Sequence, residues 1–478
     1  MKKERIALII IGIVFMTSSC KKWLDVHPKT QIEQDQLFTT EVGFQDALYG
    51  VYTVMAGDSL YGDQLTMSFL DVLAQQYSCQ TNPIHLFYQA AIYNYQDAAV
   101  KLRIAGTWER MYNAITNVNN VLLHIDAKKD VFQKGNYELV KGEALGLRAF
   151  MHLDLLRLFG TSFASNPGKA AIPYVTTVSG NVTPLSKVSE VLDQVIADLT
   201  EASTLLSGYK TIDYDFYLEG AFANDWLYRR QSHFNYWAAE ATLARAYLNK
   251  GDKQNALLHA TNVINSGAFA FETSDRITNF RDRTFIPEQI FALSKFNLLA
   301  QVSQYFQVAG GAVNINLNTQ LTNTYGNGGI VDQIYEIGSG GVTDIRYARL
   351  WQLSGTTYFC SKYWQDGGRS EFVNLVPLIR IPEMYYIAAE CSDPATATGY
   401  LNVVRGKRGL SDLGAGLDAA GIQNEILKEY QKEYYAEGQL FYYYKRQNAS
   451  QIRFTSVAGS DKIYVLPLPD GEAQYRGK

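Results

Sequence analysis

The strongest constraint on this chain is a helical spacing of its apolar residues. After Pro184 an apolar side chain recurs every three or four positions, at Val188, Leu192, Val195, Leu199, Ala202 and Leu206. This spacing places them on one face of a helix. Similar stripes occur at 41–56, 108–125 and 137–159. Because 47% of the 478 residues are hydrophobic, the chain can also bury a large core. We predict a mainly α-helical protein.

One segment, 235–267, matches the spacing of a tetratricopeptide repeat. Leu243, Ala244 and Tyr247 fit the repeat's first helix, Gly251 supplies the turn, and Ala256 is the small residue of the second helix. An ordinary helical hairpin is the alternative for this segment. Since such repeats must stack to bury their faces, we expect degenerate partners, formed by 108–125 with 137–159 and by 380–391 with 397–406.

Between Thr273 and Pro377 the helical stripes disappear and glycine becomes frequent, which indicates a loop-rich part with short strands. A final short strand is expected at 463–466. The chain contains 33 Tyr, 23 Phe and 6 Trp. The excess of tyrosine, whose ring is apolar on its face and polar at its tip, suits partly solvated surfaces. Many of these rings fall within the loop-rich part.

The N-terminus predicts export and lipidation. A basic start, Met1–Arg5, precedes an apolar run from Ile6 to Met16, which is too short to span a bilayer. Small residues then lead to Cys20, so 1–19 is predicted to be a lipoprotein signal peptide, Cys20 the lipidated residue and 20–40 a tether. An ordinary secretory signal with an incidental cysteine is the alternative. We expect a lipid-anchored protein that does not span the membrane.

Charge and cysteine content narrow the class further. The formal charge of −4 does not favour general electrostatic binding to the phosphates of nucleic acid. Once Cys20 is lipidated, three cysteines remain, Cys79, Cys360 and Cys391, which allow at most one disulfide among them. The hydrophobic core must therefore hold the fold.

Searches for catalytic and metal motifs find no strong match. No zinc helix, phosphate-binding glycine loop or nucleophile elbow occurs, and each of the six histidines is interpreted as packed or solvated. The acidic group Asp213, Asp215 and Glu219 lacks the glycine of a Ca²⁺ loop, so a solvated loop is favoured there. Four more carboxylates recur on one helix and are interpreted as a solvated, salt-bridged face: Glu425, Glu429, Glu433 and Glu437. We expect no cofactor, no metal and no catalytic residue.

The chain resembles the SusD/RagB family of outer-membrane nutrient-binding lipoproteins. The resemblance rests on short motifs in the family's order: Cys20–Val26, Trp108–Tyr112, Asn119-Asn120, Gly142–Ala144, Leu147–Phe150, Ile196–Leu199, Arg380–Glu390, Leu401–Arg405 and Tyr464–Pro469. The chain departs from the family at one helix, where Tyr430, Tyr434 and Tyr443 and Leu440 replace the family's arginine and aspartate partners. We therefore expect tyrosine packing there in place of a buried arginine–carboxylate network.

The resemblance implies a single SusD-like domain over 41–478. About four tetratricopeptide-like hairpins, at about 41–270 and 378–450, would pack against a loop-rich ligand part at about 271–377. Family members are non-catalytic and sit over a SusC-like, TonB-dependent β-barrel transporter at the cell surface. They capture oligosaccharides, or peptides in the RagB-like branch. The resemblance carries no ligand-binding residue over to this chain, because the family binds ligands through variable loops.

We expect a surface lipoprotein that binds glycan on aromatic rings and delivers it to such a transporter. Trp351, Trp364 and Tyr88 are the predicted ligand contacts, since they fall in loop-like stretches and sugar C–H faces stack on rings. The alternative for each ring is a place in the core. The alternatives for the whole protein are a peptide-binding uptake lipoprotein, a surface glycoside hydrolase and a tetratricopeptide scaffold.

Overall fold

The computed structural model describes residues 36–133, 135–212, 226, 229–306, 318–324, 329–364 and 374–476. Cys20 and the acidic group of Asp213, Asp215 and Glu219 lie outside the described residues. Within them, no helix combines the length and apolar character needed to cross a bilayer.

Nine long helices are present in the described part of the chain: α3 (Glu41–Met55), α6 (Ala98–Ile125), α7 (Asn136–Phe159), α8 (Val188–Leu206), α9 (Tyr236–Lys250), α10 (Lys253–Ile264), α14 (Ile381–Cys391), α15 (Pro394–Lys407) and α16 (Ala419–Glu433). The predicted stripe at 188–206 coincides with α8. Helix α6 begins ten residues before the predicted 108, because Asp97 caps it by accepting from the backbone N–H groups of Ala99 and Val100 at 2.9 and 3.2 Å.

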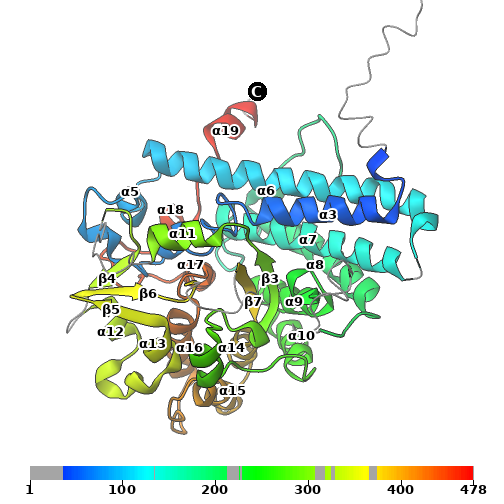
Figure 1. Ribbon diagram of the computed structural model, residues 1–478. Helices are drawn as coiled ribbons and strands as arrows, with labels where there is room; N and C mark the ends of the chain where they lie inside the picture. The colour runs from blue at the N-terminus through cyan, green and yellow to red at the C-terminus, as the bar shows by residue number, and fades with distance from the viewer. Residues whose placement is uncertain are drawn as a thin grey trace, which may run out of the picture.

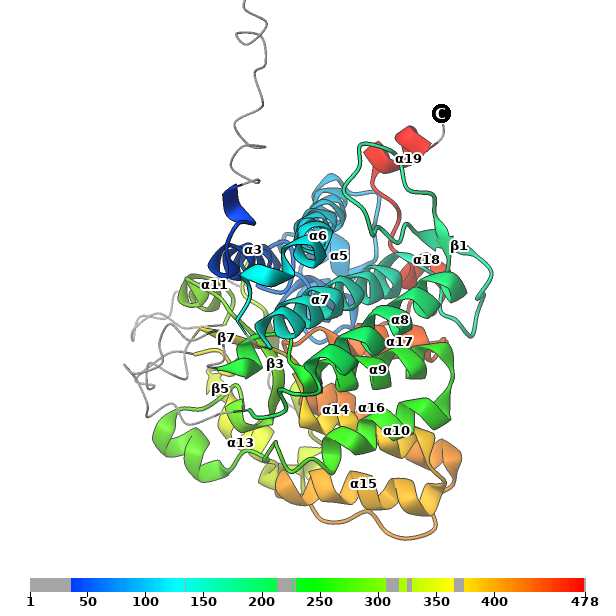
Figure 2. The same cartoon turned by 90° about the vertical axis from the view of Figure 1, so that its right-hand side faces the viewer.

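The helices stack in chain order. Helix α6 packs on α7, α7 on α8, α8 on α9, α9 on α10, α10 on α14 and α14 on α15. Figure 2 shows this stack running from α6 and α7 down to α15. The repeat-like hairpin is α9–α10, where Gly251 takes a left-handed conformation at φ 80° and Asp252 caps α10. The mainly α fold is confirmed.

The loop-rich part contains two small antiparallel sheets. Strands β3 (Gln289–Ser294) and β7 (Leu375–Arg380) pair with each other, and the second sheet has the order β4–β6–β5, from β4 (Thr322–Thr324), β5 (Trp351–Ser354) and β6 (Thr357–Cys360). Short helices lie between them: α11 (Leu298–Tyr305), α12 (Ile330–Ile334) and α13 (Ile345–Leu350). The prediction of short strands is confirmed, but the expectation that helices end at 273 is wrong. The remaining strands β1 (Ala170–Ile172) and β2 (Ser186–Lys187) pair beside α8.

Further short helices complete the fold: α4 (Phe69–Leu73), α5 (Tyr88–Ala91), α17 (Gln439–Arg446), α18 (Asp461–Tyr464) and α19 (Asp470–Arg476). The predicted strand at 463–466 is wrong, because its first two residues belong to α18. There the backbone N–H groups of Ile463 and Tyr464 both donate to the Ser460 carbonyl at 2.9 Å.

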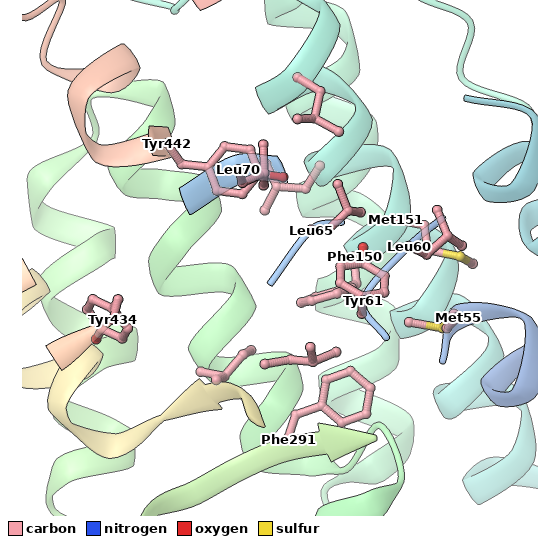
Figure 3. Close-up of a cluster of buried hydrophobic side chains, with 14 of the residues drawn as sticks. Met55, Leu60, Tyr61, Leu65, Leu70, Phe150, Met151, Phe291, Tyr434 and Tyr442 are labelled. Atoms are coloured by element: carbon pink, nitrogen blue, oxygen red, sulfur yellow. The ribbon is translucent and has the colours of Figure 1, made fainter. Parts of the chain in front are cut away.

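Aromatic residues fill much of the main core. Figure 3 shows a cluster drawn from several helices and from β3: Met55, Leu60, Tyr61, Leu65, Leu70, Phe150, Met151, Phe291, Tyr434 and Tyr442. The Tyr61 hydroxyl donates to Asp154 Oδ2 at 2.9 Å, so a buried tyrosine keeps its polar end paired. Cys79, Cys360 and Cys391 are free thiols. Tyrosine is thus largely a core residue in this protein.

The helix of regularly spaced glutamates is not a solvated face. Glu429, Glu433 and Glu437 are 0%, 1% and 4% exposed, and Glu433 accepts from three arginines: Arg346 at 2.7 Å, Arg380 at 2.6 Å and Arg408 at 2.7 Å. The prediction that tyrosine packing replaces the arginine–carboxylate network is therefore wrong. The arginines come from α13, from β7 and from the residue that follows α15, which lie 87, 53 and 25 positions before Glu433, and the tyrosines pack beside them. Arg380 lies 5.7 Å from the Tyr434 ring.

Candidate functional site: a loop-side pocket

Two segments far apart in the sequence form a pocket at the edge of the loop-rich part. The first comprises the 3-10 turn Ser78–Thr81 and the loop that leads to α5, and the second comprises residues 318–324, which end in β4. Figure 1 shows α5 and β4 close together on the same side of the molecule. The space between the segments measures about 250 Å³, and we call it the loop-side pocket; its lining residues are Ser78, Cys79, Thr81, Asn82, His85, Gln320, Thr322 and Thr324.

Hydrogen bonds between described residues join the two segments. The Leu86 backbone N–H donates to the Asn318 carbonyl at 2.7 Å, and Asn82 Nδ2 donates to Asn318 Oδ1 at 3.0 Å. His85 Nε2 lies 3.1 Å from the Gln320 carbonyl, and Ser78 Oγ donates to Asn323 Oδ1 at 3.0 Å. The pocket walls are therefore fixed relative to each other before any ligand arrives, which lowers the entropic cost of binding.

His85 is held neutral by its two hydrogen bonds. The Phe87 backbone N–H donates to His85 Nδ1 at 3.0 Å, so the ring proton resides on Nε2 and points at the Gln320 carbonyl. Burial lowers the pKa of His85 below its usual value. A second ring proton would face the Phe87 N–H, so His85 is a neutral structural donor in this pocket.

Cys79 offers no reactive thiolate. The side chain is buried, its Sγ lies 3.8 Å from His85 Nε2, and burial raises the pKa of the Cys79 thiol well above its usual value. Nucleophilic chemistry needs the thiolate. The described residues that line the pocket include no carboxylate, whereas glycoside hydrolysis requires two that face each other. The lining suits binding.

Strand β4 presents its hydroxyls to the pocket. Thr322 and Thr324 lie on one face of β4, because side chains alternate along a strand, and both line the pocket. Neither hydroxyl has a hydrogen-bond partner among the described residues. Asn323 points the other way, where its Nδ2 donates to the Tyr435 hydroxyl at 2.7 Å and to the Gln76 carbonyl at 2.9 Å. The pocket thus has two free hydroxyls on a strand anchored from behind.

The predicted aromatic residues do not line this pocket. Trp351 begins β5, is half-buried, and contacts Tyr435 edge-on at 4.5 Å. Trp364 is also half-buried, and its Nε1 donates to the Phe306 carbonyl at 2.9 Å. Tyr88 begins α5 three residues after His85 and is half-buried. Of the three, only Trp364 lies outside a helix or strand.

Sequence reasoning missed the polar residues that line the pocket. Ser, Thr and Asn residues at 78–82 precede Pro83, a composition typical of turns, but nothing in the sequence pairs this turn with residues 318–324. No group of three or more His, Cys, Asp or Glu residues is placed to hold a metal ion in the part of the chain that the structure describes.

Family comparisons cover both halves of the chain. Residues 22–248 match a family model described as "Starch-binding associating with outer membrane", and residues 305–472 match the "SusD family" model. The chain belongs to the SusD family. The description of the first model associates the family with the outer membrane. The sequence-based resemblance to the SusD/RagB family is confirmed.

Individual SusD-like proteins are similar to this chain over 91–99% of its length. A SusD-like protein P2 from Formosa agariphila is 23% identical and covers 99% of this chain and 97% of its own length. A SusD superfamily structure from Bacteroides fragilis has a TM-score of 0.69 at 20% identity, covering 92% of this chain and 98% of its own. A structure described as a laminarin-binding SusD-like protein has a TM-score of 0.63 at 18% identity and covers 91% and 98%.

Proposed function

We propose that this protein binds neutral oligosaccharides at the loop-side pocket. The observation that carries the proposal is the pair of unpartnered hydroxyls on Thr322 and Thr324, which face the hydroxyl and amide groups of the opposite segment. Sugars are recognised by such neutral donors and acceptors, and no lining residue within the described part carries a formal charge at pH 7. An anionic ligand would find no counter-charge there.

The choice of glycan as ligand class is supported by what the relatives' descriptions name. One family description names starch, and the description of one structural neighbour names laminarin. Both are uncharged glucans, in keeping with an uncharged pocket. These two polymers are therefore the first probes to use for this chain.

Tyr88, Trp351 and Trp364 remain our proposed aromatic contacts. Tyr88 stands nearest to the pocket in the chain, since α5 directly follows the loop that carries His85. The Trp351 ring packs on Tyr435, and the Tyr435 hydroxyl accepts from Asn323 of β4. Trp351 would therefore also support the strand that presents Thr322 and Thr324. Stacking on a sugar face is the role we propose for Tyr88.

We further propose that the protein is a non-catalytic lipoprotein of the cell surface, anchored through Cys20, that delivers glycan to a SusC-like, TonB-dependent β-barrel in the outer membrane. The predicted export signal and the family membership support this role. Co-purification from membranes should recover such a barrel together with this protein, and a purified protein that recovers only other partners would argue for the scaffold role instead.

A glycan array beside a peptide library tests the ligand class. The mature protein should bind neutral glucans and leave the peptides unbound. Binding to peptides alone would contradict the proposal and favour the peptide-uptake alternative. Chromatography of the bound oligosaccharide after long incubation should show no shortened product, because catalysis needs paired carboxylates that the pocket lining does not supply.

A further inference from the structure

The C-terminal helix α19 leaves a hollow on each side where it crosses α6. One hollow, of about 490 Å³, lies between α6 and the chain from Pro467 to Tyr475. The other, of about 280 Å³, lies between α6, α19 and the loop that joins β1 to β2. Figure 2 shows α19 beside this loop, above α6. Trp108, Glu472 and Tyr475 line both hollows, so the two form one groove that α19 crosses, which we call the C-terminal groove.

Rings and apolar side chains form the walls of this groove. Trp108 and Tyr112 of α6 are in contact, with ring centroids 4.8 Å apart. Tyr475 of α19 is 64% exposed, and Leu102 of α6 is 73% exposed. The run Pro467–Pro469 forms the opposite wall of the larger hollow. A ligand with apolar faces therefore finds aromatic and aliphatic surface on both sides.

The groove also holds an indole donor without a protein acceptor. The Trp108 side chain is 5% exposed, and within the described residues its Nε1–H donates to no acceptor; Nε1 is not among the fully buried atoms that lack a partner, so this N–H is open to the groove. Water can hydrate this N–H in the free protein, and an acceptor on a ligand could take the place of that water. The residue faces both hollows, so a ligand there would supply the acceptor.

Charges in the groove are mostly paired with each other. Lys101 Nζ lies 3.1 Å from Asp470 Oδ2, and Arg476 Nε lies 2.5 Å from Glu472 Oε1. Glu109 is exposed at the rim and adds a negative charge. The groove therefore disfavours an anionic ligand, while its carboxylates can accept hydrogen bonds from hydroxyl groups.

We propose that the C-terminal groove is a second binding site for a neutral oligosaccharide, separate from the loop-side pocket. This proposal rests on the proposed glycan-binding function. Sugar rings offer both the C–H faces that stack on Tyr475 and Trp108 and the hydroxyl oxygens that accept from the Trp108 N–H. The larger hollow is within the range of volumes typical of small-molecule sites.

Indole ¹⁵N–H resonances of the mature protein test the groove directly. The chain has six tryptophans, and the Trp108→Phe variant assigns the Trp108 signal while it keeps a ring in place. The probes are a hexasaccharide of α-1,4-linked glucose and one of β-1,3-linked glucose, each titrated to about 10 mM. Calorimetry on the same samples records total binding.

We expect the Trp108 signal to shift saturably with at least one probe. The shift should persist in Thr322→Val/Thr324→Val, which alters only the loop-side pocket. Tyr475→Ala should weaken the affinity read at Trp108 about fivefold or more, since it removes one stacked ring. Leu258→Ala, an exposed residue of α10, is the matched control and should leave the affinity unchanged.

An unshifted Trp108 signal at the highest probe concentration would overturn the groove proposal. Calorimetric heat that disappears in Thr322→Val/Thr324→Val would show, in those same samples, that the proposed function stands without the groove. Absence of both the shift and the heat would count against the proposed function as well. A Trp108 shift that Tyr475→Ala leaves unaltered would also overturn the site as described.

Discussion

Individual residues of the loop-side pocket have different roles: some are placed to bind ligand and others hold the pocket walls together. Within the described part of the chain, the hydroxyls of Thr322 and Thr324 have no partner, whereas His85 and Asn323 use their polar atoms to hold the walls together. This division means that ligand affinity and pocket rigidity can be changed separately. Substitution of the threonines by valine removes two hydroxyls and keeps β-branched side chains that favour a strand.

His152 should make the stability of the protein depend on pH. Its Nδ1 donates to the Arg148 carbonyl at 2.9 Å, its Nε2 accepts from the Val175 N–H at 3.0 Å, and burial lowers the pKa of His152 to about 3. The unfolded chain binds this proton near pH 6.5, so stability is full above that pH and declines as the pH falls toward 3. Between pH 6.5 and pH 5 the loss from this residue should be about 2 kcal/mol.

Urea unfolding of the mature protein at a series of pH values measures this loss. His152→Gln should reduce the slope of unfolding free energy against pH by up to the contribution of one bound proton. This expectation holds whatever the substitution does to the stability at pH 7. Val195→Ala, which opens a core cavity and removes no titratable group, should lower the stability and keep the slope. An equal slope in His152→Gln and the unmodified protein would show that His152 is not responsible.

At the scale of elements, α16 joins the repeat part to the loop-rich part through buried charge. Burial by itself raises the pKa of Glu433, but Arg408, Arg380 and Arg346 outweigh it and hold that pKa well below its ordinary value. The buried members of the network balance, with five cations and five anions: Arg346, Arg380, Arg408, Lys362 and Lys432 against Asp344, Glu288, Glu429, Glu433 and Glu437. Removing any one anion leaves buried positive charge unpaired.

Glu433→Gln should therefore be strongly destabilising. We expect the free energy of unfolding to fall by about 3–5 kcal/mol, because three buried arginines lose a shared carboxylate. The control is Glu138→Gln on α7, whose partner Lys129 lies 3.5 Å away at the surface, and it should cost less than about 1 kcal/mol. Similar losses in the two variants, measured by urea unfolding at pH 7, would contradict a structural role for the network.

Sequence patterns predicted the helices well where one face is buried along the whole element. The stripe of α8 and the turn at Gly251 are local features, and both are confirmed. The burial of the glutamates at 429–437 was predicted wrongly, because their arginine partners lie up to 87 residues away, at Arg346, and periodicity says nothing about such partners. The loop-side pocket escaped prediction for the same reason, since the Ser78–Thr81 turn and β4 meet only through tertiary structure.

At the scale of the whole molecule, the helical stack supports a loop-rich part that supplies one wall of the proposed ligand site. Figure 1 shows the small sheet β4–β6–β5 projecting from one side of the helices, with α5 above it. The C-terminal groove lies over α6, on which α3 and α7 also pack. Two sites on one chain would let it hold a long glycan at two points, which raises the apparent affinity without new contacts.

Membrane attachment is the prediction that concerns the chain as a whole. If Cys20 is lipidated, the mature protein should fractionate with membranes, because acyl chains partition into the bilayer. Cys20→Ala should release it into the soluble fraction, while Cys391→Ala, a free thiol in the fold, should not. A Cys20→Ala protein that still fractionates with membranes would refute the anchor.

Calorimetric titration of the loop-side pocket is the most direct test of glycan binding there. The oligosaccharide selected by the glycan array should bind Thr322→Val/Thr324→Val about tenfold or more weakly than the unmodified protein, since two hydrogen bonds are lost. Thr200→Val, which removes a hydroxyl on α8, should bind normally. Unchanged affinity in the double variant, with an intact fold by circular dichroism, would contradict the assignment of this pocket as the glycan site.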